Sequence, residues 1–184
     1  MPTRRSDASD LIAGLNEDLA NEYASVIQYR TFASTLRGPH RLTLRSLFEA
    51  EIADELGHAG LLADYITALG GTPTTTPAEV PAARTAQEML RSAYEAELGA
   101  IARYVERRTQ AEEAGEHGIA VTLDDIIEDE TRHRDEMQMI LDGWESESGA
   151  AESESRSSAH GARDGTRNRT TRARGREEVA GSSR

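Results

Sequence analysis

Four long segments of this chain place their core residues at alternating intervals of four and three positions, which is the spacing of one face of an α-helix. No segment shows the strict alternation of a β-strand. We therefore expect an all-α protein built as a four-helix bundle. The predicted helices run from Ser6 or Ser9 to Arg37, from Pro39 to residues 69–71, from about Arg84 to Glu113, and from about Thr122 to Trp144, with a turn at 115–118.

The lengths of the connections predict how these helices are arranged. Tight turns join the first helix to the second and the third to the fourth, so each of these pairs should be antiparallel. The link between the second and third helices, residues 71–83, is long and rich in Pro and Thr. Such a link spans at most about 43 Å when extended, close to the roughly 45 Å length of a 30-residue helix. We predict one long crossover here, with the second and third helices parallel.

Charge and composition divide the chain near residue 144. The 184 residues have a formal net charge of −12, and residues 1–144 alone sum to −13. Residues 145–184 are mostly polar and carry +1, with +5 in the Arg-rich part at 156–184. So few apolar residues cannot bury enough surface to offset the entropy of ordering. We predict a bundle domain at 1–144 and a disordered tail at 145–184.

Composition also excludes several classes of protein. The chain has no Cys, which excludes disulfides, zinc–thiolate sites and a cysteine nucleophile. We see no secretory signal at the N-terminus and no stretch of the about 20 apolar residues that a membrane helix needs. All 21 basic residues are Arg, which is typical of either a high-salt cytoplasm or a GC-rich genome. We expect a cytoplasmic protein whose acidic domain does not bind nucleic acid.

Each predicted helix carries a Glu in the middle of its buried face. Two of these Glu are followed three residues later by a His on the same face. The residues are Glu22, Glu55, His58, Glu97, Glu130 and His133. Isolated ionised carboxylates in a core cost more free energy than a domain can spare. No Arg is expected mid-helix on these faces, since the nearest, Arg108, falls near a helix end, so bound metal is the simplest source of compensating charge.

The ligand types narrow the choice of metal. Four carboxylates would be neutralised by two divalent ions, and carboxylate-rich sites with one imidazole per metal favour iron or manganese over structural zinc. A Glu on two helices and Glu-x-x-His on the other two is the ligand set of ferritin-like di-iron and di-manganese bundles. A single Glu-x-x-His pair is more often a surface pair, but two on buried faces favour a metal site. For Glu51, an accessory metal contact and a solvent-exposed side chain are equally compatible with the sequence.

Four segments resemble the helix signatures of the bacterioferritin family: "LNEDLANEYASVIQY" (15–29), "DELGHAGLLADYITALGGTP" (54–73), "QEMLRSAYEAEL" (87–98) and "DIIEDETRHRDEM" (125–137). The resemblance covers about residues 10–144, in the same order and with nearly the same spacing. It implies a ferritin-like bundle with a di-iron centre. In it, Glu22 and His58 would bind one iron, Glu97 and His133 the other, Glu55 and Glu130 would bridge the two, and Tyr29 would lie beside them.

Two departures from bacterioferritin concern haem and assembly. In that family a Met follows the first Glu of the second-helix motif and binds haem between two subunits, whereas this chain has Leu56. Leucine has no donor atom, so we expect no haem. Bacterioferritins also have a fifth helix that lines a channel of a 24-subunit shell, whereas this chain passes into a polar tail after Trp144. A 24-subunit shell, the 12-subunit shell of Dps-like mini-ferritins and a dimer all stay open.

The resemblance implies a ferroxidase that oxidises Fe(II) with O₂ or H₂O₂ at an intra-subunit di-iron site and stores or detoxifies iron in a homo-oligomeric shell. One alternative is another di-iron or di-manganese bundle enzyme, a rubrerythrin-like peroxidase or a manganese catalase. The lack of Cys excludes a rubredoxin-type domain within this chain. The other alternative is a Dps-like mini-ferritin that associates with DNA through its Arg-rich tail. We favour a solvated tail, because its positive charge is small beside the acidic domain.

Overall fold

The computed structural model of this chain describes residues 4–164, and its architecture confirms the all-α fold. Four helices follow one another in the chain, and no residue of 4–164 lies in a β-strand. Two units divide the chain, Met1–Leu141 and Asp142–Arg184, and the bundle lies in the first. The helices are α1 (Arg4–Thr35), α2 (Arg41–Ala68), α3 (Ala86–Ala114) and α4 (His117–Asp164).

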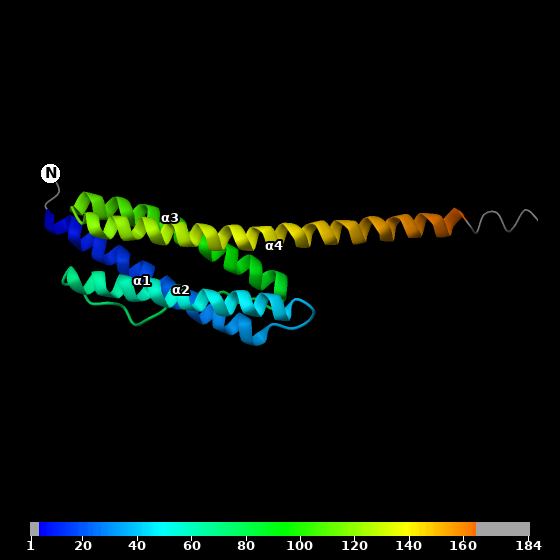
Figure 1. Ribbon diagram of the computed structural model, residues 1–184, viewed down its shortest axis with the longest axis horizontal. Coiled ribbons are helices and arrows are strands. Elements are labelled where there is room, and N and C mark those ends of the chain that lie inside the picture. The colour runs from blue at the N-terminus through cyan, green and yellow to red at the C-terminus, as the bar shows by residue number, and fades with distance from the viewer. Residues whose placement is uncertain (1–3, 165–184) are drawn as a thin grey trace, which may run out of the picture. The chain divides into compact units, whose positions relative to one another are not determined.

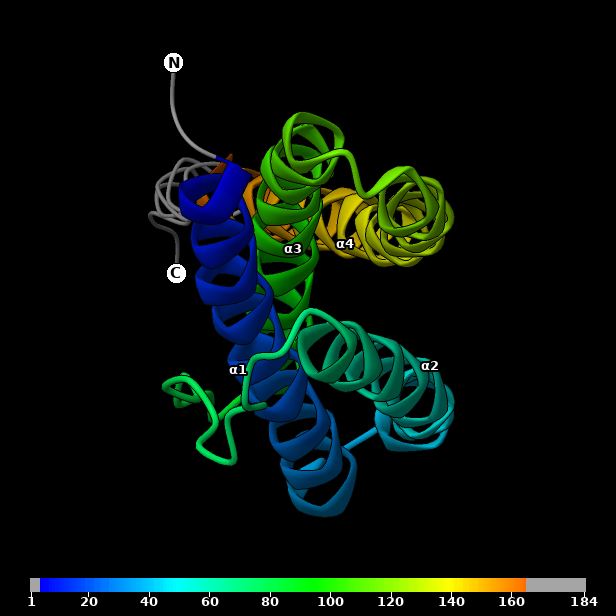
Figure 2. The ribbon, with the colours of Figure 1, turned by 90° about the vertical axis from the view of Figure 1, so that its left-hand side faces the viewer.

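Within the first unit, the helices form the predicted bundle with one long crossover. α1 and α2 are antiparallel, as are α3 and the part of α4 in this unit, while α2 and α3 run in the same direction (Figure 1). Figure 2 shows α1 and α3 on one side of the bundle and α2 and α4 on the other. The crossover passes along α1, where the Thr74 amide donates to Asn16 Oδ1 at 2.7 Å and the Ala78 amide to the Ala20 carbonyl at 2.8 Å.

Local chemistry explains where α3 begins and ends. Thr85 and Glu88 form a capping box, in which the Thr85 hydroxyl accepts from the Glu88 amide at 3.1 Å and the Glu88 carboxylate accepts from the Thr85 amide at 3.1 Å. At the other end, Gly115 adopts a left-handed conformation with φ of 80°, and its amide donates to the Glu112 carbonyl in the last turn of the helix. The capping box and the glycine fix where the crossover ends and where α4 starts.

Three predicted helix boundaries are wrong. α1 begins at Arg4, so Ser6 and Ser9 lie inside the helix instead of capping it. α4 begins at His117, upstream of the predicted Thr122, because Ile119 and Ala120 pack into the core and extend the buried face. α4 also continues past Trp144 to Asp164, through a segment without the proline that would stop a helix. The division into a domain and a tail stays a prediction, and residues 165–184 lie outside the described part.

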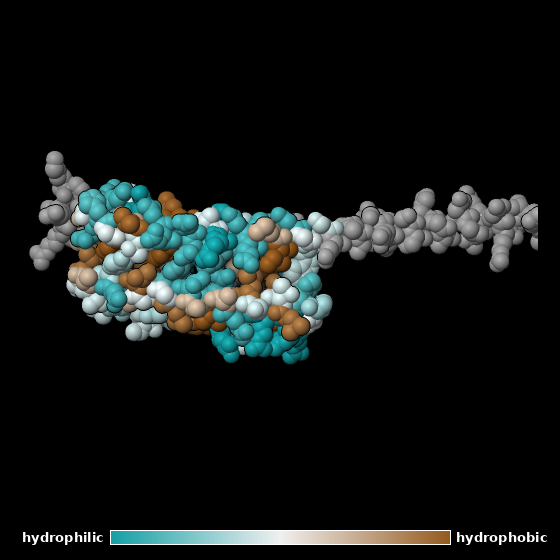
Figure 3. Space-filling view, viewed as in Figure 1, coloured by the Kyte–Doolittle hydropathy of each residue, from teal (hydrophilic) through white to brown (hydrophobic). Residues whose placement is uncertain are grey.

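The core has a polar layer between two apolar regions. On one side Leu11, Leu15, Leu19, Leu62, Ile66 and Leu123 belong to a single buried cluster. On the other side Phe48 stacks on Tyr29, with ring centroids 5.8 Å apart, and contacts Phe32 at 5.7 Å. Hydrophobic residues on the face shown in Figure 3 occur as separate patches among hydrophilic ones. Among the described residues, no helix combines the length and hydrophobicity needed to cross a membrane.

Candidate metal centre

The polar layer brings the six predicted metal ligands together in two groups. Each group places one ligand atom per residue within 4.8 Å of the others. The first contains Glu22, Glu55, His58 and Glu130, and the second contains Glu97, Glu130 and His133. None of these residues is more than 5% exposed. Glu130 belongs to both groups, as a bridging ligand would, whereas Glu55 belongs only to the first; the predicted role of each residue stays a prediction.

Glu130 faces both histidines through different oxygens. Its Oε1 lies 3.0 Å from His58 Nδ1, and its Oε2 lies 3.4 Å from His133 Nδ1. On the first side, His58 Nδ1 also lies 3.7 Å from Glu22 Oε2 and 3.9 Å from Glu55 Oε2. The two histidines therefore mark two neighbouring positions that share one carboxylate, an arrangement compatible with a two-metal site.

Several of the oxygen and nitrogen atoms that could bind metal in these groups lack hydrogen-bond partners. Within the described residues, Glu22 Oε2, His58 Nδ1, His133 Nδ1 and both side-chain oxygens of Glu130 are buried without one. Each buried polar atom left unsatisfied costs about 1–3 kcal/mol, so native proteins keep few of them. Here they face one another and consist of carboxylate oxygens and imidazole nitrogens. This donor set fits iron or manganese.

Two buried tyrosines hold the outer oxygens of two of the carboxylates. The hydroxyl of Tyr29 donates to Glu97 Oε1, and that of Tyr104 donates to Glu22 Oε1 at 2.5 Å. The resemblance predicts Tyr29 beside the centre, whereas it assigns no such place to Tyr104. The sequence does contain a signal for Tyr104, because it follows Glu97 by seven positions, just as Tyr29 follows Glu22.

The centre is built from two similar halves of the chain. One constant interval in the sequence separates Glu22 from Glu97, Tyr29 from Tyr104, Asp54 from Asp129, Glu55 from Glu130, and His58 from His133. We name the two sides by their unshared ligands: the Glu22 half contains Glu22 and His58, and the Glu97 half contains Glu97 and His133. Each tyrosine bonds the glutamate of the other helix: Tyr104 of α3 donates to Glu22 of α1, and Tyr29 of α1 donates to Glu97 of α3.

The outer nitrogen of each histidine faces an aspartate. Asp54 Oδ2 lies 3.4 Å from His133 Nε2, and Asp129 Oδ2 lies 3.8 Å from His58 Nε2. A carboxylate at this position orients the imidazole of a metal-binding histidine. Glu51 breaks the symmetry, because its Oε2 lies 3.0 Å from His133 Nδ1 while the corresponding residue of the other half is Ile126. Of the two interpretations open for Glu51, the solvent-exposed one is wrong: the residue is 5% exposed.

One sequence inference about compensating charge is wrong. Arg107, not Arg108, is the arginine that enters the bundle, where it is 3% exposed. Its Nε donates to Asp18 Oδ2 at 2.7 Å, so its charge is matched by a carboxylate outside the two ligand groups. Arg108 instead pairs with Asp124 at the surface. The six carboxylate and imidazole ligands therefore still require their own counter-charge.

In the metal-free protein, protons supply that counter-charge. Burial raises the pKa values of Glu55 and Glu97 well above their usual range, and neighbouring carboxylates raise them further. Burial lowers the pKa values of His58 and His133, but the carboxylates around them, Glu130 above all, outweigh it and raise both to about 10. Burial also opposes ionisation of Glu130, yet the two histidines hold its pKa below the usual range.

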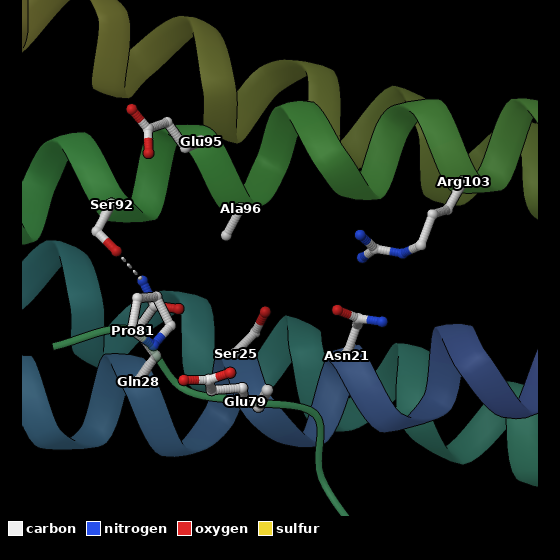
Figure 4. Close-up of a pocket in the computed structure, with 10 residues that line it drawn as sticks. Asn21, Ser25, Gln28, Glu79, Pro81, Ser92, Glu95, Ala96 and Arg103 are labelled. Carbon is white, nitrogen blue, oxygen red and sulfur yellow. Dashed lines mark hydrogen bonds between the residues drawn. The ribbon is translucent and has the colours of Figure 1, made fainter.

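A polar pocket of about 260 Å³ lies on the α1–α3 side of this layer. Its lining includes Asn21, Gln28, Ala96 and Arg103, each of which directly precedes a residue of the centre or its tyrosines. Figure 4 shows Ser92 and Gln28 joined across α1 and α3 by a hydrogen bond of 3.1 Å, beside the gap into which Ala96 points. The pocket therefore lies beside α1, α3 and the crossover, and none of its lining residues belongs to the two ligand groups.

The ferritin-like domain family matches residues 12–146 of the chain. The chain belongs to this family. Among solved structures, it is 46% identical to a ferritin-like, diiron-carboxylate protein from Bacillus anthracis, with a TM-score of 0.72, over 73% of this chain and 97% of that one. A Dps protein from Bacillus brevis is 25% identical, with a TM-score of 0.70, over 77% and 99% of the two chains.

Two further proteins are similar to this ferritin-like chain. The DNA protection during starvation protein of Brevibacillus brevis is 27% identical in an alignment 121 residues long, which covers 61% of this chain and 81% of that protein. A structure described as a dodecameric thioferritin, the bacterioferritin-related protein of Bacteroides fragilis, is 24% identical with a TM-score of 0.71, over 78% and 90% of the chains. The latter likeness concerns the fold alone.

The pKa shifts predict how pH affects the metal-free protein. His58 and His133 bind protons more tightly when folded, so their stabilising contribution is complete below an unfolded pKa of about 6.5 and is lost as the pH rises towards 10. Glu55 and Glu97 act in the same direction, because they too keep protons that the unfolded chain has released. We expect the Tm of chelator-treated protein to fall by roughly 5–10 °C between about pH 6 and pH 9.

Calorimetry of the metal-free protein measures this fall, and saturating Zn(II), which replaces the protons, should remove most of it. The paired variant His58→Gln/His133→Gln should show a smaller fall than the natural sequence, whereas His117→Gln, at the exposed start of α4, should not differ. A Tm that stays constant or rises over this pH range would contradict the charge assignment.

Proposed function

We propose that this ferritin-like protein is a cytoplasmic ferroxidase that oxidises Fe(II) at its buried carboxylate–histidine centre and stores or detoxifies the iron. The observation that carries the proposal is the set of orphaned buried donor atoms arranged around both oxygens of Glu130. Membership of the ferritin-like family and the likeness to a diiron-carboxylate protein support iron as the metal. Bound Fe(II) supplies the electrons that reduce O₂ or H₂O₂.

The residues of the chain then have distinct tasks. Glu22 and His58 would hold one metal, Glu97 and His133 would hold the other, and Glu130 and Glu55 are proposed to serve both; Glu130 lies in both ligand groups and Glu55 in the first alone. Asp54 and Asp129 orient the histidines through their outer nitrogens. Tyr29 donates its hydroxyl hydrogen to Glu97 and lies where it can exchange a proton with that ligand.

Iron titration tests the ferroxidase proposal. Under anaerobic conditions, Fe(II) binding should saturate at about two ions per chain, and admission of air should then oxidise the iron rapidly. Glu55→Ala and Glu130→Ala each remove a ligand, so we expect each to slow the oxidation by at least about tenfold in stopped-flow absorbance.

A matched control for these variants is Glu49→Ala on the same helix as Glu55, because Glu49 is exposed and pairs with Arg45 and Arg30 at the surface. Its oxidation rate should equal that of the natural sequence. The assignment of the site is wrong if Glu55→Ala and Glu130→Ala also keep the natural rate. Rapid release of O₂ from H₂O₂ by Mn(II)-loaded protein, without Fe(II) oxidation, would instead favour the manganese-catalase alternative.

We also propose that the chain assembles into a closed homo-oligomeric shell. Large apolar side chains are exposed on the outer faces of single helices, including Leu56 at 54%, Val105 at 50% and Met139 at 68%. Such side chains are common in subunit contacts. The description of the Bacteroides fragilis neighbour as a dodecamer supports a shell of this kind.

Light scattering of the purified protein tests the assembly. We expect a mass of about 12 or 24 chains, since closed shells are built by symmetric repetition of one interface. The paired variant Leu56→Glu/Val105→Glu should reduce this mass, because it places charge among contacts between subunits. The matched control Thr67→Glu/Thr109→Glu, at exposed polar positions of the same two helices, should leave the mass unchanged. A mass of two chains for the natural sequence would leave the enzyme without a storage shell and contradict this proposal.

The second candidate function is association with DNA. The Brevibacillus brevis relative is a DNA protection protein, and residues 156–184 of this chain have a net charge of +5. A cationic arm gains affinity by releasing the counterions of the phosphates, independently of base sequence. The acidity of residues 1–144 opposes such binding, so we place this function after ferroxidase activity.

A gel-shift experiment over a salt series tests the DNA proposal. If the arm binds, the full chain should retard duplex DNA at about 50 mM salt and lose roughly 10³-fold in affinity by about 200 mM. A chain ending at Asp164 keeps every described residue and should not bind. Replacing the arginines of residues 165–184 by Gln keeps the length and should also abolish the shift; a shift that survives this replacement contradicts binding through the arm.

A further inference from the structure

A charged contact between α1 and α3 lies one helical turn from the Glu22 half of the centre. Asp18 precedes Glu22 by four residues, and Arg107 follows Tyr104 by three, so the two contacts are adjacent on the same pair of helix faces. Arg107 Nε donates to Asp18 Oδ2 at 2.7 Å, and the Tyr104 hydroxyl donates to Glu22 Oε1 at 2.5 Å. All four residues are at most 3% exposed.

Arg107 is fixed tightly in this position. Its Nη1 donates to Gln110 Oε1 at 2.5 Å, and its Nη2 lies 3.9 Å from Glu17. The guanidinium lies against Gly14, where a Cβ atom would overlap it, so any larger residue at this position would displace the arginine. Arg103, which extends over the pocket towards Asn21 in Figure 4, adds a second cation 3.6 Å from Asp18 Oδ1. The contact therefore sets the register of α1 against α3.

The Glu97 half has no such ion pair. The interval that separates Glu22 from Glu97 also separates Asp18 from Ala93 and Phe32 from Arg107. Ala93 and Phe32 are therefore the counterparts of Asp18 and Arg107 in the Glu97 half. Both of these residues are buried and apolar, at 0% and 2% exposure. The ligands and tyrosines of the two halves match, but the support behind the tyrosines is charged on one side and apolar on the other.

Stability alone does not explain why the Glu22 half has the Asp18–Arg107 ion pair. Replacing a buried ion pair by well-packed apolar residues is often neutral or stabilising, because the pair must first lose its hydration. The other half of this chain has apolar residues at the same place. A role in the geometry of the site explains why charge is kept on one side, since a directional contact fixes helix register more narrowly than apolar packing.

We propose that the Asp18–Arg107 ion pair positions Tyr104, and through it Glu22, and so sets the metal affinity of the Glu22 half but not that of the Glu97 half. Tyr104 holds Oε1 of Glu22, which leaves Oε2 turned towards His58 Nδ1 at 3.7 Å. Without this hydrogen bond the carboxylate gains rotational freedom that metal binding must remove again. This inference rests on the metal centre of the proposed function and concerns residues outside its ligand set.

Two single-site backgrounds make the proposal testable. His133→Ala leaves the Glu22 half as the one intact metal position, and His58→Ala leaves the Glu97 half. Into each we introduce the uncharged pair Asp18→Asn/Arg107→Gln and measure Co(II) affinity anaerobically by calorimetry and by the visible absorption of bound Co(II). We expect affinity to fall by about tenfold in the His133→Ala background and by less than about twofold in the His58→Ala background.

Two further variants separate positioning from loss of structure. Tyr104→Phe removes one hydroxyl and should lower affinity in the His133→Ala background alone; combined with Asp18→Asn/Arg107→Gln it should lower it little further, because both act through the same contact. The matched control is Asp124→Asn/Arg108→Gln, which removes a surface ion pair between α3 and α4 with a separation of 2.5 Å. This control should leave both affinities unchanged.

The outcomes distinguish this inference from the proposed function. Co(II) binding by the natural chain with equal losses in the two backgrounds, or with no loss in either for both Tyr104→Phe and the uncharged pair, overturns the inference and leaves the metal centre intact. A natural chain that binds no Co(II), Fe(II) or Mn(II) overturns the proposed function and this inference together.

Discussion

The structure depends on one electrostatic constraint: acidic side chains of all four helices meet in the core at the same level. Each would cost several kcal/mol as an isolated buried charge, so the layer is stable only with cations or protons within it. The metal-free protein uses protons, held by histidines whose pKa values rise to about 10 and by the carboxyls of Glu55 and Glu97. Two divalent ions would replace these protons, which couples metal binding to pH and to folding.

The architecture satisfies this constraint by repetition. One sequence interval relates the ligands, tyrosines and aspartates of the two halves, and the crossover along α1 makes α2 and α3 parallel. This arrangement places α1 beside α3, so the tyrosine of each of these helices reaches the glutamate of the other. A tight turn between α2 and α3 would reverse the second pair of helices and separate each tyrosine from the glutamate it now holds.

Much of this could be predicted from the sequence, because helix faces and connection lengths are local properties. The ligand groups followed from the heptad-like spacing on four helices and from the resemblance to bacterioferritin. The helix ends predicted at Ser6, Thr122 and Trp144 were wrong, since tertiary packing and the lack of a helix-stopping residue outweighed capping signals. Asp18 and Arg107 were missed for another reason: each looks like a surface residue on its own helix, and only the register of α1 against α3 pairs them.

The residues that differ between the halves lie outside the repeated set of ligands. Glu51 adds a carboxylate 3.0 Å from His133, where the other half has Ile126, and Asp18 with Arg107 supports the Glu22 half, where the other has Ala93 and Phe32. The first difference adds negative charge to the Glu97 half, and the second fixes the geometry of the Glu22 half. A cation in the Glu97 half would thus lie near an additional carboxylate, that of Glu51, whereas a cation in the Glu22 half would meet a glutamate held in place by Tyr104. Two metals bound through matching Glu and His ligands therefore need not be equivalent, because the surrounding residues differ.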